Sequence, residues 1–411
     1  MRRTASLCGV VLAAVVAQVG LAPAAQAAPL CDGKVATVVG TRGGDVLTGT
    51  RGDDVLVGRD GQDRIDARGG DDVVCGGPGA DRLTGGPGDD RLFGGTGLPG
   101  GDDAGMVFLP DRLVGGPGDD RLAGQVSDRE FRLGVRDLID YSGTPRGIAV
   151  DLTLGTVTGA GNDTVVGRRL LLVATAHDDV VVGSPEADSM VLGRGADLVR
   201  AGRGGDEVST GTGRDEVRGG GGHDTLFSGG GADVVRAGRG DDEVKDTGAR
   251  GADDLAAGSG DDTVTDHFLS LDGQAYAGGT GEGDLLTLEA DIEEGEYDGS
   301  WDMSSGTLAM AGPVPFDARA TGLEWVDLPD GVGFELTGTA ADERVIANGP
   351  YVRFFAQGGD DVLVGTSGDD LYDGGPGTDS TPFLGLGDDN CISVERFTEE
   401  AAASDCETRR P

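Results

Sequence analysis

Residues 40–93 read GTRGGDVLT, GTRGDDVLV, GRDGQDRID, ARGGDDVVC, GGPGADRLT and GGPGDDRLF when they are divided into consecutive nines. In these six units the fourth position is glycine, the sixth is aspartate, and the eighth is Leu, Ile or Val. The frame returns at residues 115–123 and runs again through 174–245 and 356–382. A fixed period of this kind is typical of a stacked repeat architecture, in which each unit contacts only its neighbours.

The nine-residue unit predicts an all-β fold. The tripeptide around position eight is long enough for a very short strand with one apolar side chain pointing inward, and the glycines on either side permit tight turns. Stacking such units gives parallel strands, and we expect one coil to consume two units, or about eighteen residues.

The aspartate at position six is the candidate metal ligand. Turns rich in glycine can aim carbonyl oxygens inward, and hard cations such as calcium prefer oxygen ligands. We therefore predict that calcium binds at many repeats. The predicted metal-ligating residues are Asp45, Asp54, Asp63, Asp72, Asp81, Asp90, Asp120, Asp179, Asp188, Asp197, Asp206, Asp215, Asp224, Asp233, Asp242, Asp253, Asp262, Asp361, Asp370 and Asp379.

Composition and charge exclude several classes of protein. The 411 residues include 79 glycines, 33 Lys plus Arg and 73 Asp plus Glu, so the formal net charge is −40. A chain this acidic is a poor partner for nucleic acid or an anionic membrane, because basic residues must neutralise phosphates. A disordered acidic chain and a repeat that folds around cations both remain compatible with these numbers. The repeat frame favours the second.

The units match the pattern G-G-x-G-x-D-x-U-x, where U is an apolar residue, and in this respect the chain resembles secreted RTX-type, hemolysin-type calcium-binding proteins. The resemblance implies a parallel β-roll, a right-handed β-helix of nonapeptide repeats, with calcium held between adjacent turns by position-six aspartates and turn carbonyls. Asp111 joins the frame only if Leu98 to Pro110 loop out, and Glu343 stands in for aspartate in its unit. The unit 347–355 lacks an acidic residue and is expected to bind nothing.

Folding is expected to depend on the metal. One buried Leu or Val side chain per unit cannot offset the conformational entropy lost by nine ordered residues, and stacked aspartates repel one another. Calcium binding would supply the missing free energy, so binding and folding become one event.

The N-terminus and the cysteines predict an exported protein. Residues 1–27 have a basic start, an apolar run from Leu7 to Val19, and the cleavage pattern Ala25-Gln26-Ala27, and no apolar segment of the chain is long enough to span a bilayer. We expect a secreted, extracellular protein. Cleavage would leave four cysteines, for which the pairs Cys31–Cys75 and Cys391–Cys406 are favoured over a metal site.

Two interruptions divide the repeats, and both contain longer β-strand patterns in the same order. We interpret them as two copies of one spacer, the second enlarged, with its aromatic residues packed under the edge of the roll. The predicted segments are a signal peptide (1–27), an N-terminal repeat block (28–123) with a loop insertion near 98–110, a β spacer (124–173), a central repeat block (174–265), a larger aromatic-containing spacer (266–337), a C-terminal repeat block (338–391) and a C-terminal cap (392–411).

The sequence favours a non-enzymatic role. The three histidines His177, His223 and His267 show no zinc-protease spacing, and the many Asp-Asp pairs follow from the repeat. We expect an extracellular structural, matrix or adhesive scaffold whose partners are calcium ions and cell-surface or matrix components. The alternatives are a calcium-dependent hydrolase or polysaccharide-acting enzyme with its site in 266–337, and a toxin or adhesin component.

Overall fold

The computed structural model describes residues 28–96, 110–124, 136–167, 170–248, 251–267, 273–281, 283–289, 297–311, 316–383, 389–394 and 396–397. The expected signal peptide, most of the expected loop at 98–110 and Cys406 lie outside these residues. Throughout the described part the regular structure is β-strand, and no helix there could cross a membrane. The all-β prediction is confirmed.

The strands form two long parallel sheets, which the chain visits alternately. Sheet 1 contains β4 (Val46–Thr48), β6 (Arg64–Asp66), β8 (Arg82–Thr84), β10 (Arg112–Val114), β12 (Leu138–Asp140), β16 (Leu171–Val173), β18 (Ser189–Arg194), β20 (Glu207–Gly213), β22 (Thr225–Phe227), β23 (Gly230–Gly231), β25 (Glu243–Asp246), β27 (Thr263–His267), β29 (Leu285–Glu289), β33 (Trp325–Asp327), β35 (Arg344–Ile346), β37 (Val362–Val364), β39 (Ser380–Phe383) and β41 (Arg396–Phe397).

Sheet 2 contains β3 (Val38–Val39), β5 (Val55–Val57), β7 (Val73–Cys75), β9 (Arg91–Phe93), β11 (Arg121–Ala123), β13 (Ala149–Asp151), β14 (Thr156–Thr158), β15 (Asn162–Val166), β17 (Val180–Val182), β19 (Leu198–Arg203), β21 (Glu216–Gly221), β24 (Val234–Arg239), β26 (Asp254–Ser259), β28 (Ala275–Thr280), β30 (Tyr297–Asp302), β31 (Thr307–Ala311), β32 (Phe316–Thr321), β34 (Val332–Thr337), β36 (Val352–Phe355), β38 (Leu371–Asp373) and β40 (Asn390–Ile392).

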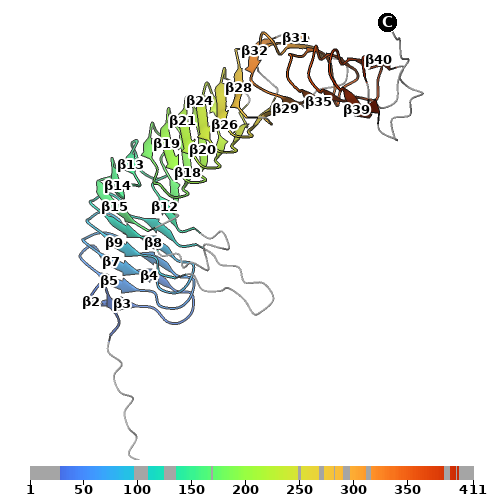
Figure 1. Ribbon diagram of the computed structural model, residues 1–411. Coiled ribbons are helices and arrows are strands. Elements are labelled where there is room, and N and C mark those ends of the chain that lie inside the picture. The colour runs from blue at the N-terminus through green and yellow to red at the C-terminus, as the bar shows by residue number, and fades with distance from the viewer. Residues whose placement is uncertain are drawn as a thin grey trace, which may run out of the picture.

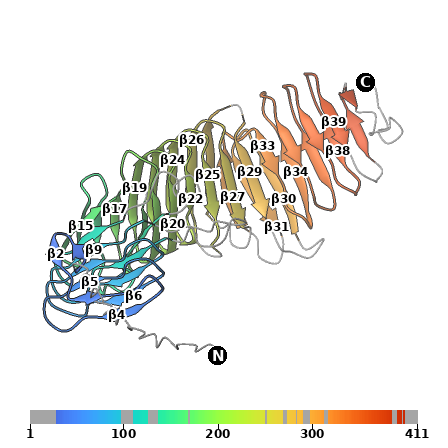
Figure 2. The ribbon, with the colours of Figure 1, turned by 90° about the horizontal axis from the view of Figure 1, so that it is seen from below.

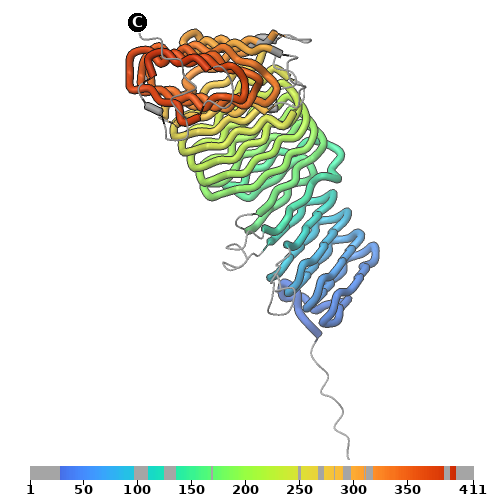
Figure 3. The backbone as a smooth tube through the Cα atoms, turned by 90° about the vertical axis from the view of Figure 1, so that its right-hand side faces the viewer, coloured from blue at the N-terminus to red at the C-terminus, as the bar shows by residue number. Residues whose placement is uncertain are grey.

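The register confirms that one coil consumes two units. Leu47 of β4 pairs with Ile65 of β6, and Leu56 of β5 pairs with Val74 of β7, so partners are eighteen residues apart. Figure 1 shows the coils stacked into one elongated solenoid from β3 to β40. Figure 2 shows strands of successive coils side by side, and Figure 3 shows the flattened outline of the C-terminal coils.

The core is a single apolar line through the middle of the solenoid. The position-eight side chains Leu56, Ile65, Val74 and Leu83 are at most 1 % exposed and belong to one cluster that continues to Cys391. Each coil adds a small number of apolar side chains, which is the consequence of a three-residue strand with one inward position.

The two interruptions share one topology. In the first, β13, β14 and β15 form an antiparallel meander, in which β15 pairs back to β11 and β13 pairs forward to β17. In the second, β30, β31 and β32 form a meander that pairs back to β28 and forward to β34. Sheet 1 continues past both, because β12 pairs with β16 and β29 with β33. Two copies of one spacer would produce this repetition.

The aromatic residues of the second interruption lie in two environments. Trp301 and Phe334 are each 1 % exposed and belong to the main core, as expected for packing residues. Trp325 instead lies on the outer face of sheet 1, 41 % exposed, with the guanidinium carbon of Arg344 5.6 Å from its ring centroid.

A disulfide fixes the N-terminal hairpin to the solenoid. Strands β1 (Leu30–Cys31) and β2 (Lys34–Val35) are antiparallel, and the Cys31–Cys75 bond joins β1 to β7 on the outer face of sheet 2. Cys31 packs there against Val55 and Val73 in a second, small cluster. The first predicted pairing is therefore confirmed. Cys391 is also disulfide-bonded, but its predicted partner Cys406 lies outside the described residues.

Candidate metal centres

The predicted ligands form columns along the turns, one residue per coil. In one column the backbone N–H of Asp45 donates to Oδ1 of Asp63 at 2.8 Å, and the N–H of Asp63 donates to Oδ1 of Asp81 at 2.8 Å. The other turn carries the same ladder from Asp54 to Asp72 and Asp90. Nineteen of the twenty predicted aspartates are buried, and Asp45, in the first coil, is half-buried. The frame thus places one carboxylate per turn at a fixed distance from the next.

The second carboxylate oxygen is the notable feature of most turns. Among the described residues, Oδ2 of a set of buried aspartates accepts no hydrogen bond, and we call these the open carboxylates. They are Asp63, Asp72, Asp81, Asp90, Asp120, Asp197, Asp206, Asp224, Asp233, Asp242, Asp262 and Asp284. A buried carboxylate oxygen without a donor is costly, so a recurring set of them is an arrangement that a bound cation would stabilise.

At several of these turns a carbonyl oxygen of the next coil lies close to the open oxygen. A Cβ built on Gly58 would lie 2.2 Å from Oδ2 of Asp63 and 2.7 Å from the carbonyl oxygen of Gly76. At Gly76 the corresponding distances are 2.3 Å to Oδ2 of Asp81 and 2.7 Å to the carbonyl oxygen of Gly94. In these two turns glycine at position one therefore keeps side-chain atoms out of the space between the carboxylate and the carbonyl.

The negative charge of the buried column aspartates is unfavourable without a cation. Burial, together with repulsion from neighbouring carboxylates in the columns, raises the pKa of Asp81 to about 7 and that of Asp90 to about 8. Burial likewise raises the pKa of Asp197 to about 7, with Asp215 and Asp179 adding to the effect. Hydrogen bonds from the preceding coil only partly oppose these shifts.

These donors fit calcium. Within the described residues no three His, Cys, Asp or Glu side chains come together as a metal-binding group, so side chains alone do not complete a site. Backbone carbonyls would have to supply the remaining oxygens, and an all-oxygen set of carboxylate and carbonyl donors is the kind that calcium accepts. The residues that would hold it are the open carboxylates and the position-one carbonyls one coil further on.

The raised pKa values predict that acid and calcium act as alternative partners for the buried carboxylates. In chelator the folded state binds more protons than the unfolded chain between the unfolded pKa near 4 and the folded values near 7 to 8, so stability falls as pH rises through that window. We expect more β-sheet circular dichroism in chelator at pH 5.5 than at pH 8. The folded chain should bind calcium more tightly at pH 8 than at pH 5.5, because fewer protons compete with the ion for the same carboxylates. A metal-free chain that is better folded at pH 8 would contradict the buried-carboxylate interpretation.

The columns contain more acidic residues than the sequence predicted. Asp111 and Glu343, which fitted the frame poorly, both occupy column positions: the N–H of Asp81 donates to Oδ1 of Asp111, and the N–H of Glu343 donates to Oδ1 of Asp361. In unit 347–355 the corresponding place is held by buried Val352, as expected of a unit without a ligand.

Four further aspartates were missed. The columns continue through Asp137, Asp163, Asp284 and Asp389, each of which accepts a backbone N–H from the preceding coil at its Oδ1. Each is followed two residues later by an apolar residue or cysteine, which is the one part of the repeat signal that survives there. The hydroxyl of Tyr141 donates to the second oxygen of Asp163, which is therefore not open.

The family comparison agrees with this geometry. The family model of the RTX calcium-binding nonapeptide repeat matches residues 39–74, 76–97, 110–128, 173–208, 209–244, 247–265 and 353–380. The chain is an RTX-type repeat protein. No curated protein matches the chain. The RTX matches stop at the two meanders, whereas the two sheets and the aspartate columns run on through them.

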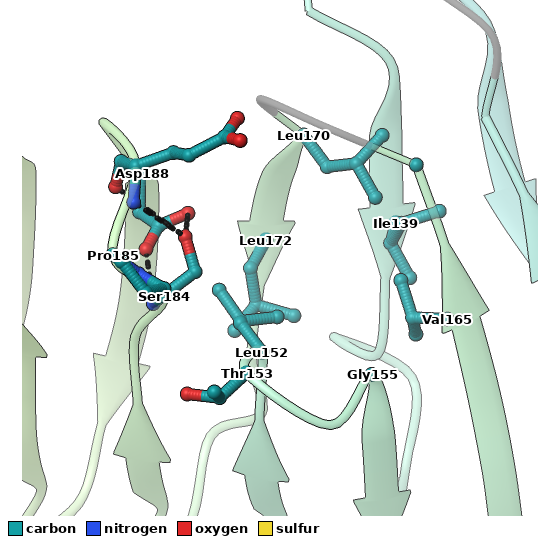
Figure 4. Close-up of a pocket in the computed structure, with 12 residues that line it drawn as sticks. Ile139, Leu152, Thr153, Gly155, Val165, Leu170, Leu172, Ser184, Pro185 and Asp188 are labelled. Carbon is teal, nitrogen blue, oxygen red and sulfur yellow. Dashed lines mark hydrogen bonds between the residues drawn. The ribbon is translucent and has the colours of Figure 1, made fainter.

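Two depressions lie on the described part of the RTX solenoid. The first, of about 250 Å³, lies at the first meander and is lined by apolar side chains that include Leu152, Val165 and Leu172 (Figure 4). The second, of about 380 Å³, is open and polar, and Asp327 and Asn348 line it beside β33. The side-chain N–H of Asn348 donates to Oδ1 of Asp327 at 2.9 Å. The exposed histidines His177 and His223 are in neither depression.

Proposed function

We propose that this RTX-type protein is exported and acts outside the cell as a calcium-stabilised structural, matrix or adhesive scaffold, and that it is not an enzyme. The observation that carries the proposal is the columns of open carboxylates, several of which lie beside a carbonyl of the next coil. Such columns run along most of the molecule, so calcium bound in them would stabilise the stacking of coils along the whole solenoid. A catalytic site would concentrate its special groups in one place.

The calcium supply supports an extracellular setting. Weak all-oxygen sites of this type suit the millimolar calcium found outside cells, and the chain would remain poorly folded where calcium is scarce. The Cys31–Cys75 disulfide fits an oxidising compartment. The export pattern at residues 1–27 provides a route out, and an elongated solenoid stiffened on arrival can span a distance between partners (Figure 1).

Export can be tested with the full chain in a secreting bacterial host. We expect the protein in the medium, with its N-terminus near Ala28, resistant to protease in millimolar calcium and rapidly degraded in chelator. The control is a chain without residues 2–27, which should remain in the cell. Retention of the full chain in the cytosol with Met1 intact would contradict the proposed setting. Equal protease sensitivity with and without calcium would contradict the proposed mode of action.

A further inference from the structure

Position two of the repeat distinguishes two classes of turn in this protein. In one class a Thr or Ser at position two bonds the position-six carboxylate of its own turn, and we call these the sealed turns. They contain Asp45, Asp54, Asp179, Asp188 and Asp370. Glu343 accepts both donors of Thr339 at Oε1, and its buried Oε2 accepts no hydrogen bond, so it belongs to neither class. The other class contains the open carboxylates defined above.

The sealed geometry uses a backbone and a side-chain donor together. The N–H of Thr366 donates to Oδ2 of Asp370 at 2.7 Å while its hydroxyl donates to Oδ1 at 2.9 Å. The N–H of Ser184 donates to Oδ2 of Asp188 at 2.6 Å, and the hydroxyl donates to Oδ1 at 3.1 Å. Figure 4 shows these bonds at the edge of the first depression. Ser and Thr hydroxyls commonly form hydrogen bonds with nearby groups of their own turn in this way.

In the open class the same N–H points elsewhere. Arg59 and Gly77 occupy position two with φ of 81° and 114°, and their N–H groups donate to the carbonyls of Gly76 and Gly94 in the next coil, each at 2.9 Å. The position-two residues Thr41, Thr50, Thr175, Ser184, Thr339 and Thr366 are absent from the positive-φ set. One N–H therefore has two destinations, its own carboxylate or the next coil, and the choice decides whether Oδ2 is satisfied.

Four of the five sealed turns lie at the start of a repeat block. Asp45 and Asp54 lie in the first two units of the N-terminal block, and Asp179 and Asp188 in the first two units after the first meander. Asp370 lies further along the C-terminal block. The N-terminal and central blocks thus each begin with two turns whose carboxylates have donors of their own.

We propose that position two determines which turns take calcium. Thr or Ser there replaces the ion with protein donors, and a left-handed residue leaves the carboxylate open for it. The sealed turns at the start of the N-terminal and central blocks then form metal-independent starting points onto which the calcium-dependent coils stack. This inference rests on the proposed calcium binding and adds the rule that selects the sites.

The N-terminal block offers adjacent turns of both classes, which allows changes in either direction. Replacing Arg59 and Arg68 by threonine (R59T/R68T) should seal Asp63 and Asp72 and lower the number of bound calcium ions by two, counted by native mass spectrometry on the full chain. Replacing Thr41 and Thr50 by glycine (T41G/T50G) should open Asp45 and Asp54 and raise the number by two. The matched control R59G/R68G keeps the left-handed turn and should leave the count unchanged.

Hydrogen exchange in chelator supplies a readout without metal. Amides of the sealed turns near Thr50 and Thr175 should retain protection that the open turns lack, and T41G/T50G should remove it from the N-terminal block. If both pairs of variants bind as many ions as the wild type, the position-two rule is overturned while calcium binding stands. If the wild type binds no ions, the proposed function itself fails. Uniform exchange across sealed and open turns would overturn the idea of metal-independent starting points.

Discussion

In chelator at pH 8 the full chain should lose most of its β-sheet circular dichroism, and millimolar calcium should restore it. The reason is the column structure: buried carboxylates such as Asp72 and Asp90 lie one coil apart, and the open oxygen of each has no donor among the described residues. Like charges at this spacing repel, and the narrow core of one apolar side chain per unit offers little to offset them. Calcium supplies positive charge that offsets the repulsion, and it gives the open oxygen an interaction partner.

Magnesium is the matched control for this titration. It carries the same charge but demands a smaller octahedral site and gives up its water reluctantly, so a cradle of a carboxylate and carbonyls should accept it poorly. We expect magnesium at the same concentration to restore little of the spectrum. A spectrum that is unchanged between chelator and millimolar calcium would contradict the coupling of folding to binding.

Two adjacent glycines in one turn should respond very differently to alanine. At Gly222 the backbone has φ of 143°, and a Cβ would lie 1.6 Å from the carbonyl oxygen of Gly204 in the preceding coil. Gly222→Ala must therefore move the backbone of one coil away from the next. The strained φ alone costs about 1–3 kcal/mol, and the displaced coil also loses ladder hydrogen bonds. We expect a large rise in the calcium concentration needed for folding.

Gly221→Ala is the control within the same turn. A Cβ there would meet only the Cβ of Arg239, at 4.0 Å, and the backbone is not in the left-handed region. Its effect on the free energy of unfolding should stay within about 0.5 kcal/mol, as for an ordinary surface substitution. Equal effects of the two variants, measured by thermal unfolding in calcium, would contradict the close stacking of coils at position four.

Much of this structure was predictable because the repeat is strict where it occurs. The spacing of Asp63, Asp72 and Asp81 sufficed to predict parallel coils of eighteen residues and a column of carboxylates, and pairs such as Leu56 with Val74 confirm it. The short separation of Cys31 from Cys75, on neighbouring elements at one end, allowed the disulfide to be paired correctly.

The interruptions could not be predicted in the same way. Leu138 pairs with Leu171 and Leu285 with Trp325, so the chain leaves the eighteen-residue period, forms a meander and returns to the same sheet. A sequence frame loses its register across such an excursion, which is why Asp137 and Asp284 were missed. The difference between open and sealed turns was also hidden, because it depends on which way the position-two N–H points and not on the aspartate itself.

The central claim is that this chain is held together by many calcium ions bound at its repeat turns. The most direct test is the number of calcium ions bound by the full chain, measured by equilibrium dialysis together with circular dichroism on the same samples. The open carboxylates predict roughly ten ions or more, taken up over the concentration range in which the β-sheet signal appears. A stoichiometry of one or two ions, or ions taken up with no gain in β-structure, would contradict it.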